Sequence, residues 1–298
     1  MITARCNLSC TYCILENAPH QLKQELTLPE KMELIAHLYY NLNFRSLTIS
    51  GGEALIIGKS APSDFLKLLD FLKQFKSNDA EKNLKLKLYT NGIYLTEEVA
   101  AAMKGIIDEV SINIDSSNDE TLLLLGRNKT TKDTYFLKVI DVINLLANHQ
   151  IKVKLHTVVN ALNYKTITSE VKTIYEVVKK ANPMFSQWKI YQYMSYDDTI
   201  VDEKHQIDVS VFNSVKMDIQ AELKGFDVDV HFKDTTEMDQ SLFNILATGI
   251  AQYRLPETTW TTTPRTENLL NYKSMEQLLE QNKVDLDLFN LYHSYIPH

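Results

Sequence analysis

The sequence is poor in cysteine, and its few cysteines lie close together. There are three in 298 residues, and all of them fall between Cys6 and Cys13. An odd number of cysteines in one short segment does not suit a disulfide framework, which excludes the class of small disulfide-stapled proteins. Such a group predicts metal or redox chemistry instead.

Long apolar runs and an excess of positive charge are also missing. No run approaches the roughly 20 apolar residues that cross a bilayer, and the basic and apolar segments of a secretory signal are absent. The 31 basic and 38 acidic residues give a net charge of −7, which disfavours nucleic acids and anionic membranes as partners. We therefore expect a cytoplasmic monomer, with 44% hydrophobic residues to build its core.

Short β-rich runs alternate with helical patterns through the first two thirds of the chain. Strands are predicted over 46–50, 84–90, 109–114, 151–159 and 187–194, and helices over 29–42, 63–76, 97–103, 132–149 and 166–181. This alternation predicts an α/β fold with a parallel sheet.

The last third of the chain has a different character. Helices are predicted over 209–223, 237–252, 274–281 and 285–292, a strand over 227–232, and a loop over 255–266. We therefore divide the chain into an α/β unit over 1–200 and an α-rich extension over 201–298 that covers the substrate side.

Each predicted strand alternates polar and apolar residues, whereas buried parallel strands are usually continuously apolar. The polar side chains that share a face are Ser46, Thr48 and Ser50; Lys85, Lys87, Tyr89 and Asn91; Ser111, Asn113 and Asp115; Lys152, Lys154 and His156; and Lys189, Tyr191 and Tyr193. Because successive side chains point to opposite sides of a sheet, the pattern predicts a curved sheet with helices outside and a polar interior. The alternative is a set of edge strands whose polar faces are solvated.

The three cysteines are spaced C-x3-C-x2-C. Thiolates are soft ligands that suit iron–sulfur clusters, and a four-iron cluster normally takes four cysteines. With three in the whole sequence, one iron is left for a non-cysteine ligand. The alternatives are no metal at all, or a zinc site completed by His20, which lacks the paired ligand spacing of structural zinc sites.

This motif, with Tyr12 before the third cysteine, resembles the signature of the radical S-adenosylmethionine (SAM) family. The resemblance implies a [4Fe–4S] cluster on Cys6, Cys10 and Cys13, with SAM on the open iron. It also implies a partial (β/α)6 barrel fold over 1–200. The run from Ser50 to Glu53 is similar to the family's GGE motif, which binds the methionine ammonium of SAM.

Other residues at strand ends complete the predicted SAM site. Thr90-Asn91-Gly92 ends a strand, although such a run is often a simple turn, and barrel active sites are built at the carboxyl ends of strands. Arg127 is predicted to bind the SAM carboxylate, since its geometry matches that group; its alternative is a solvated surface charge. The predicted cofactor-binding residues are Tyr12, Ser50, Gly51, Gly52, Glu53, Thr90, Asn91, Asn113, Asp115, Arg127 and Tyr193.

Four further segments, 125–127, 154–160, 188–192 and 233–238, resemble viperin and its prokaryotic relatives. These radical SAM enzymes dehydrate a ribonucleoside triphosphate to a 3′-deoxy-3′,4′-didehydro nucleotide in antiviral defence. The resemblance implies that Lys154 and Lys189 bind phosphates, with His156 beside them as a substrate-binding residue. An external electron donor is also implied.

The chain departs from that pattern at three positions. His156 stands where the family has Asn, Gln187 where it has Arg, and Leu242 where it has a Tyr proposed to relay the final electron and proton. Losing an Arg removes a bidentate phosphate contact. Only five residues precede Cys6, so we also expect a truncated chain or a start farther upstream.

Two other functions remain open from the sequence. The first is a radical SAM enzyme that acts on a peptide or another small molecule. Many peptide-modifying members, and the molybdopterin-precursor type, carry extra clusters with their own cysteines, and none follows Cys13 here. The second is a non-catalytic interaction module, which the intact cysteine loop disfavours.

Overall fold

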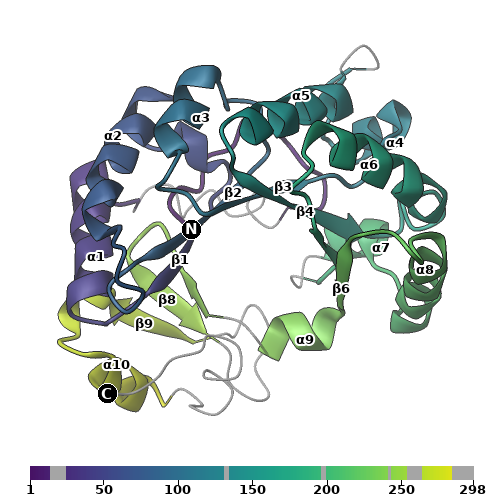
Figure 1. The fold of residues 1–298 in the computed structure, drawn as a ribbon. Coiled ribbons are helices and arrows are strands. Elements are labelled where there is room, and N and C mark those ends of the chain that lie inside the picture. The colour runs from purple at the N-terminus through teal and green to yellow at the C-terminus, as the bar shows by residue number, and fades with distance from the viewer. Residues whose placement is uncertain (14–24, 131–133, 196–198, 241–242, 254–263, 284–298) are drawn as a thin grey trace.

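Six parallel strands in chain order form a curved, open sheet (Figure 1). The computed structural model describes residues 1–13, 25–130, 134–195, 199–240, 243–253 and 264–283. The strands are β1 (Ser46–Ile49), β2 (Lys85–Thr90), β3 (Glu109–Asn113), β4 (Lys152–Val159), β5 (Gln187–Gln192) and β6 (Asp229–Lys233). Within the described residues β1 and β6 do not pair with each other, so the barrel is partial, as predicted.

Helices cover the outer face of the sheet (Figure 1). They are α1 (Leu28–Tyr40), α2 (Ser63–Leu72), α3 (Glu97–Met103), α4 (Asp119–Leu124), α5 (Tyr135–Asn148), α6 (Ile167–Ala181) and α8 (Val209–Glu222), with short 3-10 turns η3 (Ala54–Ile56) and η4 (Lys73–Phe75). Helix α7 (Thr199–His205) lies instead at the carboxyl ends of the strands, where Val201 packs with Tyr12 and Tyr193. In α6 the buried residues Ile167, Val171 and Ile174 recur every three or four positions, as the helical period requires. They join the outward side chains of the strands, such as the fully buried Leu155, in one core.

The inner faces of the strands carry the polar residues that the sequence pattern places there. Ser111, Lys154 and Gln187 are paired at one level of the sheet, and His156 and Lys189 are paired at the next. Ser111, Lys154 and His156 are only 1%, 7% and 4% exposed. The alternative of solvated edge strands is therefore excluded for this part of the sheet.

The C-terminal segment adds a small antiparallel sheet beside α1 (Figure 1). After α9 (Thr235–Gln240) come β7 (Phe243–Ile245), β8 (Ile250–Tyr253), β9 (Arg265–Asn268), η5 (Leu269–Asn271) and α10 (Met275–Asn282). A second core joins Leu34 and Leu38 of α1 to Ala251, Leu269 and Leu278. The small sheet is thereby attached to the β1 side of the barrel.

Two expectations for this part of the chain need correction. The helix predicted over 237–252 is wrong beyond Gln240, since residues 243–245 and 250–253 form β7 and β8, and the turn between these strands contains Gly249 at φ +82°. The strand predicted over 227–232 is β6, so the main sheet extends past the boundary placed at residue 200. That the segment 201–298 covers the substrate side stays a prediction.

Two of the predicted elements lie wholly or mostly outside the residues that the structure describes. The helix over 285–292 and most of the loop over 255–266 lie outside the described residues, whereas Arg265 and Thr266 belong to β9. Among the helices that the structure describes, none is long and apolar enough to span a bilayer.

Candidate active site

The backbone that leads to the first cysteine runs along the end of β1. Gly52 N donates to the carbonyl of Thr3 (2.9 Å). A Cβ on Gly51 would lie 2.6 Å from Thr3 O, and one on Gly52 would lie 2.4 Å from Arg5 O. The Gly-Gly pair is therefore required for this close approach, which brings Cys6 to the carboxyl end of the sheet.

Glu53 fastens the end of β1 to the end of β2. Its side chain is fully buried and accepts hydrogen bonds from Leu55 N (3.0 Å), the Thr90 hydroxyl (2.7 Å) and Asn91 N (2.7 Å). Burial raises the pKa of the carboxyl group, while these hydrogen bonds oppose that shift. Glu53 thus orders the strand ends, and its contact with the SAM ammonium stays a prediction.

The cysteine loop presents three thiols that are not joined in disulfides. Cys6 is exposed and Cys10 and Cys13 are half-buried, and Cys13 N donates to Cys10 O (3.0 Å). Leu8 N and Asn91 Nδ2 lie 3.4 and 3.9 Å from Cys6 Sγ, as donors to the sulfur. Burial raises the pKa of Cys10 to about 12, but coordination deprotonates a thiol outright. Hydrogen bonds to cluster-binding sulfurs are typical of iron–sulfur sites, so the loop fits a cluster.

The arrangement does not suit a single metal ion. Among the described residues, no three His, Cys, Asp or Glu side chains are grouped so that they could hold one. Zinc draws its thiolate ligands to about 2.3 Å from one centre, whereas the cysteines of an iron–sulfur cluster bind separate irons. His20, the ligand of the zinc alternative, lies outside the described residues.

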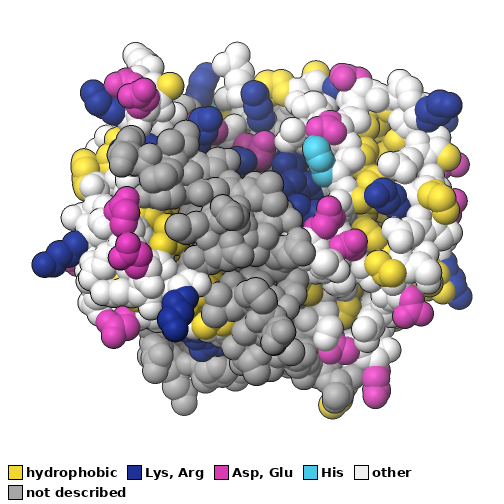
Figure 2. Space-filling model, turned by 90° about the horizontal axis from the view of Figure 1, so that it is seen from below, with side chains coloured by type: hydrophobic (Ala, Val, Ile, Leu, Met, Phe, Trp, Pro, Cys, Tyr) yellow, Lys and Arg dark blue, Asp and Glu magenta, His cyan; other side chains and the backbone are white. Residues whose placement is uncertain are grey.

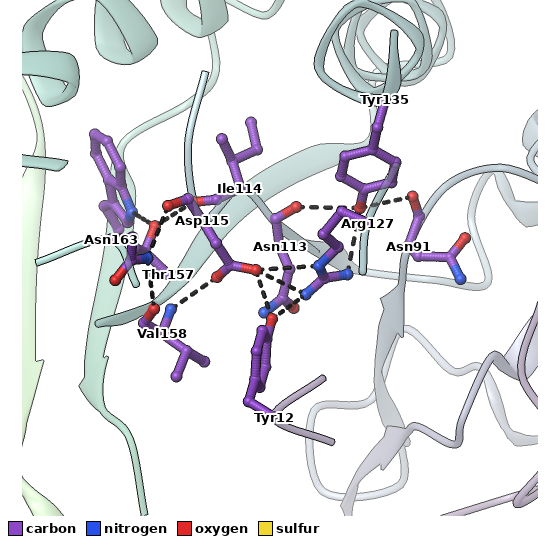
Figure 3. Close-up of polar contacts among 11 residues, drawn as sticks. Tyr12, Asn91, Asn113, Ile114, Asp115, Arg127, Tyr135, Thr157, Val158 and Asn163 are labelled. Atoms are coloured by element: carbon purple, nitrogen blue, oxygen red, sulfur yellow. Dashed lines mark hydrogen bonds and ion pairs between the residues drawn. The ribbon is translucent and has the colours of Figure 1, made fainter. Parts of the chain in front are cut away.

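A buried polar network holds Tyr12 of the cysteine loop (Figure 3). The Tyr12 hydroxyl donates to Asp115 Oδ2 (2.5 Å) and accepts from Arg127 Nη2 (2.6 Å). Arg127 Nη2 also lies 2.9 Å from Asp115 Oδ2, and Arg127 Nη1 donates to the Tyr135 hydroxyl (3.5 Å). Arg127 is 8% exposed, so it is not a solvated surface charge, and its contact with the SAM carboxylate stays a prediction.

The segment before Arg127 packs directly on the cysteine loop. Thr11 N donates to Leu125 O (3.1 Å), and the Thr11 hydroxyl donates to Leu124 O (3.2 Å). Gly126 has φ +72°, and a Cβ there would lie 2.1 Å from Ser9 O. This glycine is therefore a structural part of the loop's support, a role that its motif alone did not reveal.

Tyr193, Asn113 and Ser50 also lie at the carboxyl ends of strands. Tyr193 is buried, packs in one cluster with Tyr12, and donates to Asp202 Oδ1 (2.8 Å). The carbonyl of Asn113 accepts from the Tyr135 hydroxyl (3.3 Å). Sequence reasoning missed Tyr135 and Asp202, because neither belongs to a motif.

Four lysines from the inner faces of the sheet form a second group. Lys87 of β2, Lys154 of β4, Lys189 of β5 and Lys233 of β6 interact electrostatically. Burial, followed by repulsion from the other three, lowers the pKa of Lys189 to about 8. Figure 2 views the molecule from the side of α9 and α10 and shows Lys and Arg side chains gathered near the middle of this face. Lys87 and Lys233 were not predicted as site residues, although Lys87 lies on the predicted polar face.

His156 lies between two tyrosines beside these lysines. Its ring makes edge contacts with Tyr89 and Tyr191, with centroids 4.7 and 5.3 Å apart. Burial first, and then Lys189 and Lys154, lower the pKa of His156 to about 3, so the ring is neutral. Its Nε2 is buried and has no hydrogen-bond partner among the described residues.

Gln187, at the second departure, contacts the lysine group. Lys154 Nζ donates to Gln187 Oε1 (3.1 Å). The neutral amide of Gln187 adds no charge beside Lys154, whereas the Arg that the viperin-like pattern has at this position would add a positive charge. The third departure, Leu242, lies outside the described residues.

Comparison with known proteins identifies the family. A model of the radical SAM superfamily matches residues 1–177. The chain is 31% identical over 156 residues to a GTP 3′,8-cyclase of Chlorobaculum tepidum, covering 52% of this chain and 42% of that protein. It is 28% identical over 197 residues to an S-adenosylmethionine-dependent nucleotide dehydratase of Lacinutrix mariniflava, covering 63% of this chain and 36% of that protein. The chain therefore spans less than half the length of these two relatives.

Solved structures share the fold at low sequence identity. The structure of anSMEcpe with bound AdoMet and a peptide superposes with a TM-score of 0.66 at 15% identity, covering 98% of this chain and 81% of that one. The structure of Streptococcus suis SuiB bound to S-adenosylmethionine superposes with a TM-score of 0.64 at 11% identity, covering 98% of this chain and 66% of that one. With the cysteine loop and the open barrel, these matches show that the chain belongs to the radical SAM superfamily, whose cofactors are a [4Fe–4S] cluster and SAM.

Proposed function

We propose that this chain is a viperin-like enzyme that dehydrates a ribonucleoside triphosphate. The observation that carries the proposal is the group of four lysines inside the barrel. In a protein with a net charge of −7, lysines gathered in an interior favour a ligand with several negative charges. The names of the relatives, nucleotide dehydratase and GTP cyclase, support a nucleotide.

In this proposal one region of the barrel binds the cofactors and a second region binds the phosphates of the substrate. When bound, the cluster and SAM would supply the radical chemistry that removes a ribose hydrogen, and the protein would supply orientation. Glu53 and Asn91 order the strand ends beside the cysteine loop, where SAM would bind. Lys154 and Lys189, farther back along β4 and β5, would hold the phosphates. The ribose would then lie between the two regions and lose its 3′ hydroxyl as water.

The setting of this activity follows from the same resemblance. A 3′-deoxy-3′,4′-didehydro nucleotide lacks the hydroxyl that extends a nucleic acid strand, so it would terminate viral or phage synthesis. We expect the enzyme to work in the cytoplasm and to receive its electron from a separate donor protein.

Cyclisation of GTP is the second candidate. It is favoured by the 31% identity to a GTP 3′,8-cyclase. It is disfavoured because no cysteine follows Cys13 in the sequence, so this chain has no cysteine ligands for a second cluster. A peptide substrate has less support, since the structural neighbours with bound peptides share only the fold with this chain.

Turnover with a panel of nucleotides tests the proposal. The anaerobically reconstituted protein would be given SAM, a reductant and each ribonucleoside triphosphate in turn, with a no-substrate control. We expect one nucleotide to stimulate 5′-deoxyadenosine formation and to yield a product lighter by one water. A GTP-derived product that retains the water would favour the cyclase, and no stimulation by any nucleotide would refute both.

A further inference from the structure

The guanidinium of Arg127 joins three parts of the site that are distant in the sequence (Figure 3). It contacts Tyr12 of the cysteine loop, Asp115 beyond β3 and Tyr135 at the start of α5. The side chains of Arg127 and Asp115 are 7% and 0% exposed. This is a buried ion pair, in which each charge depends on the other for compensation.

The first contact fixes the cysteine loop. Tyr12 stands between Cys10 and Cys13, and its hydroxyl is held from both sides, because it donates to Asp115 and accepts from Arg127. A ring so restrained limits how the two neighbouring cysteines can turn. Arg127 therefore acts on the ligands through Tyr12 rather than by touching them.

The second contact reaches the strand ends. The Tyr135 hydroxyl, which accepts from Arg127, lies 3.3 Å from the carbonyl oxygens of both Asn91 and Asn113. Asn91 follows β2 and Asn113 ends β3, in the region predicted to bind SAM. One guanidinium thus links the loop for the cluster to the strand ends for SAM.

We propose that Arg127 is a positioning residue for the cysteine loop, and that its buried positive charge raises the reduction potential of the cluster bound there. One-electron reduction adds a negative charge to the cluster, and a cation buried nearby stabilises that charge because water screens it poorly. Nearby charges and hydrogen bonds are among the factors that set cluster potentials. Asp115 offsets part of the effect, but its negative charge is shared with Tyr12 and with Val158 N, which donates to Oδ1 (2.8 Å). The inference needs no nucleotide and stands apart from the proposed function.

A redox titration of the reconstituted protein without SAM, followed by electron paramagnetic resonance, tests this inference. Arg127→Met is expected to lower the midpoint potential, whereas Arg127→Lys keeps the cation and stays close to the wild type. Arg45→Met is the matched control, because Arg45 lies over the Tyr39 ring (4.4 Å) and outside the network around Tyr12. Its potential should be unchanged.

Two outcomes would overturn the inference. If Arg127→Met keeps its iron and its potential but binds SAM more weakly, Arg127 serves the SAM carboxylate instead. Asp115→Asn gives the second measurement and decides the matter if Arg127→Met fails to hold a cluster. Removing the negative partner should raise the potential, and an unchanged or lower value would contradict the role assigned to the guanidinium.

Discussion

At the scale of single residues, Lys189 is a half-buried lysine whose charge changes near pH 8. Its pKa of about 8 results from burial and from Lys154, Lys233 and Lys87, with Glu109 opposing the shift. The other charged group near the lysines is Asp229, and the neighbouring His156 stays neutral. Lys189 is therefore positive below about pH 8 and neutral above it, although an exposed lysine would stay charged.

This titration predicts a pH-dependent affinity for the nucleotide. Between pH 7 and pH 9, kcat/KM for the nucleotide should fall by about tenfold, the effect of losing about 1.4 kcal/mol of binding, because a neutral lysine no longer attracts a phosphate. The measurement is a pH profile of kcat/KM, which reports the free enzyme. Lys189→Arg stays protonated over this range and should remove the step near pH 8. The same step in that variant would show that another group titrates.

At the scale of elements, the cysteine loop depends on the turn that follows α4. Gly126 combines φ +72° with contact to the loop, whereas Gly105 has φ +76° and no atom within 4 Å of an added Cβ. Alanine substitutions at the two glycines therefore distinguish the effect of backbone strain, which both share, from the effect of a collision with the cysteine loop, which only Gly126 has.

Substituting alanine at these two glycines gives a matched prediction. Gly105→Ala should cost about 1 kcal/mol, the strain of a left-handed conformation. Gly126→Ala should cost about 2 to 4 kcal/mol, since overpacking is added to that strain, and should lower the iron bound per chain. Urea unfolding and iron analysis measure the two effects. Equal losses of stability with full iron content in both variants would mean that the turn does not support the loop.

The main sheet was predictable because each strand carries its own alternating pattern. The outer side chains are apolar and the inner ones polar, and both properties are visible in a few consecutive residues. The hairpin of β7 and β8 was not predictable from the sequence, because its strands are short and the spacing of its apolar residues also suits a helix. In the structure Gly249 has φ +82° in the turn, a conformation that the interior of an α-helix does not contain.

The site was predictable where a motif is local. The spacing of the three cysteines and the Gly-Gly pair after a strand are visible in a few consecutive residues, and the structure places the two segments side by side. The hydrogen bonds of Tyr12 to Asp115 and Arg127 join residues that are 103 and 115 positions apart in the sequence. The local sequence around each residue does not indicate such distant partners. Likewise, Lys233 joins the lysine group only because β6 pairs with β5.

At the scale of the whole molecule, the open barrel separates two kinds of site. The cysteine loop lies at the carboxyl ends of the strands, where it contacts Asn91 and Arg127. The lysines lie farther back on the inner faces of β2, β4 and β5, and on β6. A substrate that reaches from one region to the other would present its phosphates to the lysines and its sugar to the cofactor region.

The most direct test of this account is the effect of phosphate number on 5′-deoxyadenosine formation. A nucleoside and its mono-, di- and triphosphate would be compared in the wild type, in the Lys154→Met/Lys189→Met double variant and in Lys138→Met, which removes an exposed lysine from α5 on the outer face. The account predicts that KM falls with each added phosphate in the wild type and in Lys138→Met, and that the double variant loses this advantage. Equal stimulation by the nucleoside and its triphosphate in the wild type would contradict the assignment of the lysines to the phosphates.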